Sequence, residues 1–294
     1  MKNLERRKRV VRQIKQIKNS TKPNLLITSL TAISRLGLLI GLVCFTAIVP
    51  WAPFLSPVFM LLAVPLLRAL ENLGGHEGAH ENWIRNKQNL NDKVANLMAA
   101  WWVVSSAESF RARHNDHHRH FGEAPDPCFT RFSMFQFAQI KSWGKFLAAL
   151  RREYLPYLRE YWEGYANVKA PQLATSLALH VMLMLIGTWL LPGFWIWWLV
   201  LVIIPFLLLL PVFRMLAESQ EHNYDGSDEL ADSHSNLTLF SRLYLHPVGD
   251  AYHKLHHVHY RIPHFRMRSV HLELMGTSPE YRDSHKQTQQ GASK

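Results

Sequence analysis

Apolar and charged residues are segregated into long blocks along the 294-residue chain. Four apolar stretches each approach the roughly 20 residues that a helix needs to cross the hydrocarbon core of a bilayer. Within each of the two pairs, only a short Pro-containing turn separates the stretches. The pattern therefore predicts an all-α polytopic membrane protein with four transmembrane helices in two hairpins. The stretches occupy about residues 36–52, 54–73, 172–191 and 194–213.

The segments outside these stretches are polar, and they predict a helical lobe in the cytosol. Apolar side chains mix with Lys and Arg over residues 94–104 and 129–161, which is typical both of helices on a membrane surface and of ordinary core helices. No internal repeat is present, so we expect a single domain. Its parts are a basic N-terminus (1–30), the hairpins (36–73 and 172–213), the lobe (74–171 and 214–277) and a polar tail (278–294).

The distribution of charge predicts the orientation of the spans. The two short turns contain no Lys or Arg, whereas the N-terminus, the long middle segment and the C-terminus are rich in both, which places these three segments in the cytoplasm. Tryptophans gather at the opposite ends of the spans, as in an aromatic belt. They are Trp51, Trp189, Trp195, Trp197 and Trp198.

The net charge of +11 is compatible with an anionic lipid or an acidic protein partner, and a nucleic-acid motif is lacking. The longest basic run, residues 2–22, comes just before an apolar segment, and we interpret it as an anchored topogenic segment and not as a cleavable signal. The two cysteines argue against a disulfide framework or a thiolate metal site.

Three groups of histidines stand out among the 17 in the chain, one HxxxH and two HxxHH. Residues three and four apart lie on one face of a helix, so each group points several imidazoles at one place. The charge pattern puts all three on the same side of the membrane. His222, which follows the last span, is a further candidate. The groups are His76 and His80; His114, His117 and His118; and His253, His256 and His257.

Imidazole suits zinc, copper, nickel or iron. Nine histidines exceed what one ion takes, and a catalytic zinc site keeps three protein ligands, so the set predicts two metal ions with open positions. Carboxylates near the histidines are candidates to accept the second imidazole N–H, although exposure on a helix surface explains them equally well. These are Glu77, Asp116, Glu221 and Asp250.

From about residue 36 to 271 the chain resembles the membrane fatty acid desaturase family, which carries one HxxxH and two HxxHH boxes on four spans. The stretch Tyr252-His-Lys-Leu-His-His-Val-His-Tyr-Arg-Ile-Pro263 looks like the third box. The resemblance implies that the nine histidines bind two Fe²⁺ ions. It also places Glu218 where some relatives have a water-mediated polar ligand, whereas Glu77 stands where Asp is common.

The resemblance further implies an O₂-dependent oxidoreductase that attacks an unactivated C–H bond. Since no cytochrome b5 domain is fused to the chain, electrons would come from a ferredoxin, a rubredoxin or a cytochrome b5-type protein with its reductase. We favour desaturation of a fatty acyl chain. A hydroxylase acting on a carotenoid, a terpenoid or a smaller metabolite is the alternative. A non-enzymatic metal-binding or transport protein fits less well, because the histidine groups lie outside the spans.

His180 differs from the other histidines because it falls in the middle of the third apolar stretch. An ionisable side chain at that depth is costly and raises the question of a functional role. We expect a neutral imidazole that is hydrogen-bonded to a neighbouring helix.

Overall fold

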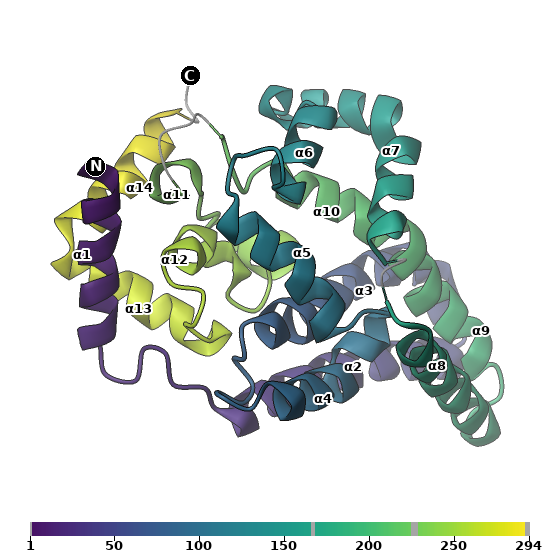
Figure 1. The fold of residues 1–294 in the computed structure, drawn as a ribbon. Helices are drawn as coiled ribbons and strands as arrows, with labels where there is room; N and C mark the ends of the chain where they lie inside the picture. The colour runs from purple at the N-terminus through teal and green to yellow at the C-terminus, as the bar shows by residue number, and fades with distance from the viewer. Residues whose placement is uncertain (1, 166–167, 225–228, 292–294) are drawn as a thin grey trace. The chain divides into compact units, whose positions relative to one another are not determined.

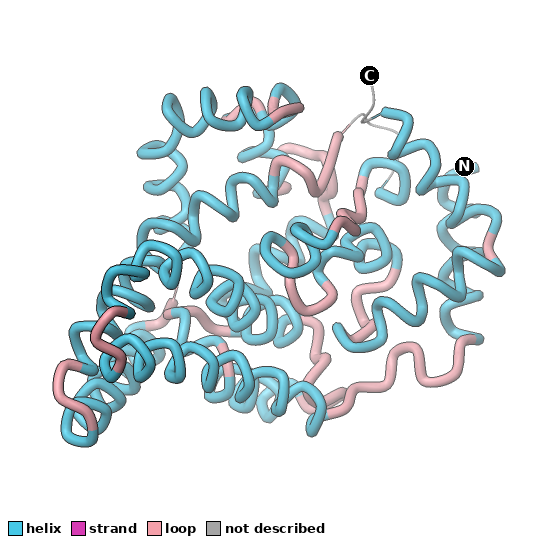
Figure 2. Tube along the Cα trace, turned by 180° about the vertical axis from the view of Figure 1, so that it is seen from behind, coloured by secondary structure: helices cyan, strands magenta, loops and turns pink. Residues whose placement is uncertain are grey.

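A computed structural model describes residues 2–165, 168–224 and 229–291. These residues form helices joined by loops and turns, with one isolated β-bridge between His222 and Ser233 (Figures 1 and 2). Over the described ranges no strand is formed. The predicted all-α fold is therefore confirmed.

The chain divides into two compact units, and the expected single family domain stays a prediction. Unit 1 consists of Met1–Asn24, Ala112–Glu153 and Leu216–Lys294, and unit 2 consists of Leu25–Arg111 and Tyr154–Met215. Residues 74–111 and 154–171, which we had placed in the cytosolic lobe, thus belong to the same unit as most of the apolar helices. The boundaries fall within α5 (Ala107–Arg119), α7 (Trp143–Tyr165) and α10 (Leu210–Glu218).

Unit 2 contains the apolar helices. Its elements are α2 (Leu25–Ile48), η1 (Ala52–Leu55), α3 (Ser56–Glu71), η2 (Asn72–Glu77), α4 (Gln88–Met98), η3 (Ala100–Val103), α8 (Ala170–Leu190), α9 (Phe194–Trp198), η5 (Leu199–Ile203) and η6 (Pro205–Leu209). Of these, η2, η5 and η6 are π-helical turns. The helix α2 packs against α3, and α8 packs against α9 and η3.

Four helical stretches are long and apolar enough to cross a membrane, which confirms the predicted number of spans. The first begins at Leu25, earlier than the predicted residue 36. Arg35 interrupts the apolar run in the sequence, but the helix continues through it, and the Thr31 hydroxyl donates to the Ile27 carbonyl. The stretches are Leu25–Ile48, Ala52–Glu77, Ala170–Leu190 and Phe194–Glu218.

Large apolar side chains point outward from the candidate spans of unit 2. Leu26 on α2 is 67% exposed, and on α8 Leu185 is 67% and Trp189 is 83% exposed. An apolar surface of this kind suits contact with lipid and is rare on a soluble monomer.

The imidazole of His180 is hydrogen-bonded inside unit 2, as expected from the sequence. Trp198 on α9 donates its indole N–H to His180 Nδ1 over 3.2 Å, and both side chains are buried. The bond joins α8 to α9 and accounts for a polar side chain in an apolar helix.

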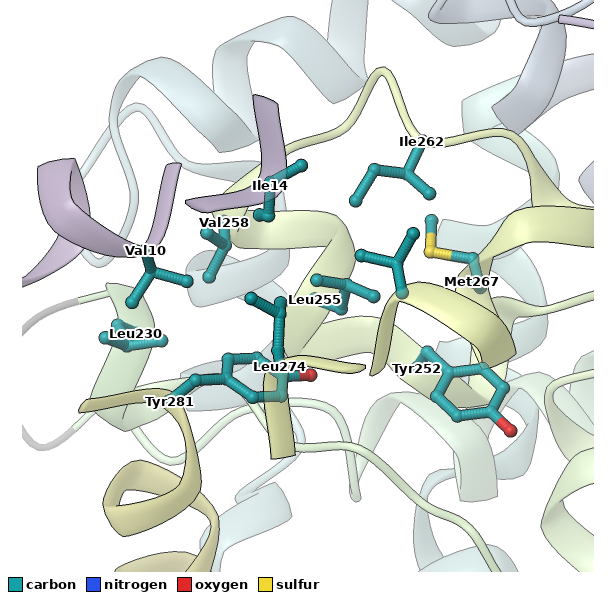
Figure 3. Close-up of a cluster of buried hydrophobic side chains, with 11 residues drawn as sticks. Val10, Ile14, Leu230, Tyr252, Leu255, Val258, Ile262, Met267, Leu274 and Tyr281 are labelled. Atoms are coloured by element: carbon teal, nitrogen blue, oxygen red, sulfur yellow. The ribbon is translucent and has the colours of Figure 1, made fainter. Parts of the chain in front are cut away.

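Unit 1 contains most of the histidines. In addition to its parts of α5, α7 and α10, it consists of α1 (Lys2–Gln16), α6 (Pro127–Met134), η4 (Phe137–Gln139), α11 (Glu229–Asp232), η7 (Ser241–Leu245), η8 (Asp250–Tyr252), α12 (His253–Val258), α13 (His264–Thr277) and α14 (Pro279–Gly291). The helices α1, α13 and α14 contact one another (Figure 1). A buried apolar cluster joins them to α11 and α12 (Figure 3).

Candidate metal centre

One histidine cluster of unit 1 is formed by α5 and α12. His114 and His118 are four residues apart on α5 and therefore share a face, and His256 reaches them from α12. The Nε2 atom of His118 lies 3.1 Å from that of His114 and 2.9 Å from that of His256, and the third Nε2 separation is 3.3 Å. We call this triangle the three-histidine cluster.

The four-histidine cluster consists of His117, His222, His253 and His257. The Nε2 atom of His257 lies 3.2 Å from that of His117 and 3.1 Å from that of His253, and the His253 and His222 Nε2 atoms are 3.0 Å apart. One ligand atom from each of the four residues lies within 4.8 Å of all the others. All four side chains are buried.

Two carboxylates fix how these imidazoles are protonated. Asp126 Oδ1 lies 2.8 Å from His117 Nδ1, and Glu229 Oε1 lies 2.9 Å from His257 Nδ1 and 3.3 Å from His118 Nδ1. Because a carboxylate only accepts, Nδ1 of His117, His118 and His257 carries a hydrogen, and Nε2 is the atom that each of the three offers to a cluster. Glu229 thereby serves one histidine of each cluster.

The geometry of both clusters fits a metal ion. Nitrogens bound at 2.0–2.1 Å to one ion lie about 2.9 Å apart at a right angle and about 3.3 Å apart at the tetrahedral angle. The Nε2 separations of 2.9–3.3 Å fall close to this range. Imidazole nitrogens this close together are stabilised when a proton or a cation lies between them, so both clusters are suited to hold a cation.

Burial favours the neutral imidazoles that a metal requires. It lowers the pKa of His222, His253 and His257 well below the ordinary value, and neighbouring histidines lower it further. His117 differs. Burial also lowers its pKa, but electrostatic interaction with Cys128 and the hydrogen bond to Asp126 outweigh this and raise the pKa to about 10. A metal ion entering the four-histidine cluster would therefore displace a proton.

The first histidine group lies in unit 2. His76 belongs to η2 and His80 follows it, and their rings meet edge to face with centroids 5.3 Å apart. Both side chains are buried. Glycines make this segment compact, because a Cβ on Gly74 would collide with the backbone of Ala100.

Comparison with known proteins places the chain in a family. The model of the family described as fatty acid desaturase matches residues 50–289. The chain belongs to the fatty acid desaturase family. No curated protein and no solved structure gives a match. The match extends over all three histidine boxes and His222 of this family member, and it begins after α1 and α2.

The carboxylates that the sequence proposed as partners of the histidines have varied surroundings in this family member. Asp116 is exposed, and Glu77 accepts a hydrogen bond from Asn82 over 3.3 Å. Glu218 forms a two-pronged ion pair with Arg131, with N–O distances of 3.1 and 3.2 Å.

Glu221 and Asp250, the other two proposed carboxylates, both face His246. The Nδ1 atom of His246 lies 3.6 Å from Glu221 Oε1 and 3.4 Å from Asp250 Oδ2. The sequence did not single out His246 as a partner for them.

Sequence reasoning missed Asp126 and Glu229, the carboxylates that contact histidines of the clusters. Asp126 also caps the N-terminus of α6 by accepting from the Cys128 backbone N–H, and the sequence Asp126-Pro127 is a recognisable helix start. That signal indicates the cap but not the histidine. No local pattern marks Glu229, which is 28 residues from His257.

Buried histidines outside the clusters predict a loss of stability in acid. Burial lowers the pKa of His271 from 6.5 to about 4 and that of His285 to about 3. Below pH 6.5 the unfolded chain therefore binds more protons than the folded chain, so the free energy of unfolding falls as the pH drops from about 6.5 towards 4.

We expect His271→Asn to reduce this slope in denaturant titrations between pH 6.5 and 4, by at most one proton, or about 1.4 kcal/mol per pH unit. The asparagine keeps a polar partner for the Tyr281 hydroxyl, which lies 3.0 Å from His271 Nδ1. Equal slopes in the two proteins would contradict the prediction.

Proposed function

We propose that this protein is an O₂-dependent desaturase that introduces a double bond into a fatty acyl chain, with two Fe²⁺ ions held by nine histidines. The ligands would be His76, His80, His114, His117, His118, His222, His253, His256 and His257. The convergence of Nε2 atoms in the three-histidine and four-histidine clusters carries the proposal for seven of them. His76 and His80 are included on the HxxxH spacing and on family membership.

Bound iron would supply the reduction of O₂ and the removal of hydrogen from an unactivated C–H bond. Overall, an acyl chain loses two hydrogens to form the alkene, and O₂ takes up these together with two electrons and two protons to give two waters. The chain itself would hold and orient the ions. Asp126 and Glu229 keep the hydrogen on Nδ1 of their histidines, and burial of the four-histidine cluster keeps water away.

We also propose how the protein meets its partners. The four apolar helices would lie in the membrane, with both termini and the histidine boxes on the cytoplasmic side. A long apolar substrate suits this setting. Two electrons per turnover would come from a separate ferredoxin, rubredoxin or cytochrome b5-type protein with its reductase.

Lipid analysis tests the proposed reaction. In a host supplied with iron and a defined pool of fatty acids, we expect the wild type to yield a product two mass units lighter than its substrate, and His256→Ala to yield none. His120→Ala is the control, because His120 lies two residues after the second box and faces the exposed Glu123 instead of either histidine cluster. We expect this control to keep wild-type product.

Two other outcomes would redirect the assignment. A product sixteen mass units heavier would show that the protein is a hydroxylase. If His256→Ala kept the wild-type product, the proposed ligand set would be wrong.

A further inference from the structure

The N-terminal helix α1 is an integral part of unit 1. Val10 and Ile14 are one turn apart on α1, and both are fully buried. They belong to the same apolar cluster as Leu255 and Val258 of α12, the helix that carries the third histidine box (Figure 3). The helix that we had interpreted as a topogenic segment thus packs directly on a histidine-bearing helix.

Arg7 lies one turn before Val10 on this helix and reaches the histidines through its guanidinium group. Its Nη1 atom is 2.5 Å from Glu229 Oε2, and its Nη2 donates to the backbone carbonyl of His257 over 3.0 Å. One side chain therefore holds both a carboxylate and the backbone of a cluster histidine.

The two carboxylate oxygens of Glu229 contact different partners. Oε2 forms the ion pair with Arg7, while Oε1 accepts hydrogen bonds from Nδ1 of His118 and of His257. His118 belongs to the three-histidine cluster and His257 to the four-histidine cluster. We infer that Arg7 is a positioning residue for both metal sites, acting through Glu229; this inference rests on the proposed function.

The physical reason is that a carboxylate held at one oxygen only is free to turn. The guanidinium group is planar and always charged, so its contact with Oε2 fixes the direction in which Oε1 faces the two imidazoles. The side chain of Glu229 is only 10% exposed, so it has little water to replace a lost partner. Removing the partner that orients a ligand typically weakens metal binding 10- to 100-fold.

The test compares the iron-loaded full-length wild type with Arg7→Gln, Arg7→Lys and Glu229→Gln. Arg9→Gln is the matched control, because Arg9 lies on the same helix and pairs with Glu280 of α14 at 2.7 Å, without contacting Glu229. The measurement is the rate at which each protein releases Fe²⁺ to an excess of a ferrous chelator, together with the iron content before the challenge.

We expect Arg7→Gln and Glu229→Gln each to release iron about 10-fold faster than the wild type. Arg7→Lys keeps the positive charge but loses the planar guanidinium group that contacts two partners at once. Its release rate should therefore lie between those of the wild type and Arg7→Gln. The double variant Arg7→Gln/Glu229→Gln should lose iron no faster than Glu229→Gln alone, because both changes remove the same support.

Three results would overturn the inference. The first is wild-type release from Arg7→Gln, and the second is equal acceleration in Arg9→Gln, which would show that only the docking of α1 matters. The third is a wild type that binds no iron, which would overturn the proposed function as well and is thereby distinguished from the first two.

Discussion

Alanine at His253 or at His114 is expected to leave about one metal ion per chain instead of two and to abolish turnover. His253 belongs to the four-histidine cluster and His114 to the three-histidine cluster. A single truncation removes one ligand from one site only, so the other site keeps its full set of imidazoles. Loss of catalysis should nevertheless be complete, at least about 10³-fold, because residues that act as a unit are not additive in their effect.

Metal analysis of the purified proteins checks this expectation. The double variant His114→Ala/His253→Ala should retain essentially no tightly bound iron, and His120→Ala should retain two ions. If either single variant kept both ions, or lost both, the division into two sites would be contradicted.

Gly74→Ala is expected to destabilise the protein severely and to reduce metal binding by His76. A Cβ at this position would overlap the backbone nitrogen and Cα of Ala100. Backbone atoms do not move aside as the end of a flexible side chain does, so η2 and η3 must separate. Overpacking of a core costs about 1–3 kcal/mol, and a clash with backbone lies at or above the upper end of that range. Total stability is only about 5–15 kcal/mol.

Gly41→Ala provides the matched control for this change. Gly41 lies in α2, and nothing is within 4 Å of the position its Cβ would take. Alanine in an open helical position should be neutral or slightly stabilising. Thermal unfolding in detergent compares the two variants, and equal midpoints would contradict the expected clash.

Helical periodicity accounts for what the sequence predicted well. The HxxHH spacing brought His114 and His118 to one face of α5, and His253 and His257 to one face of α12, as the structure has them. The apolar blocks predicted four spans for the same reason, since length and composition are local properties. The start of the first span was misplaced because Arg35 ends the apolar run but not the helix.

Contacts between distant segments account for what the sequence did not predict. Periodicity does not say that His256 joins His114 and His118, while its neighbour His257 joins His117. Nearby carboxylates such as Asp116 were the natural candidates for the imidazole N–H groups, whereas the partners of the described histidines include Asp126 and Glu229.

The role of α1 was missed for a related reason. Its basic composition predicted a membrane-proximal segment, but its two fully buried apolar residues, Val10 and Ile14, make only a short stripe among many charges. A stripe of two residues is too weak to distinguish a packed helix from a solvated one.

The π-helical turn η2 sets the rotational phase of the first histidine box. A π turn accommodates one residue more than an α turn, whereas the same extra residue in a regular α-helix would rotate everything that follows by about 100° around the helix axis. His76 lies inside this turn, and α3 precedes it without a break. If Asn72–Glu77 formed regular α turns with the same residues, His80 would therefore point to a different side of the helix. At this point the backbone geometry decides the direction of the box together with the spacing of its histidines.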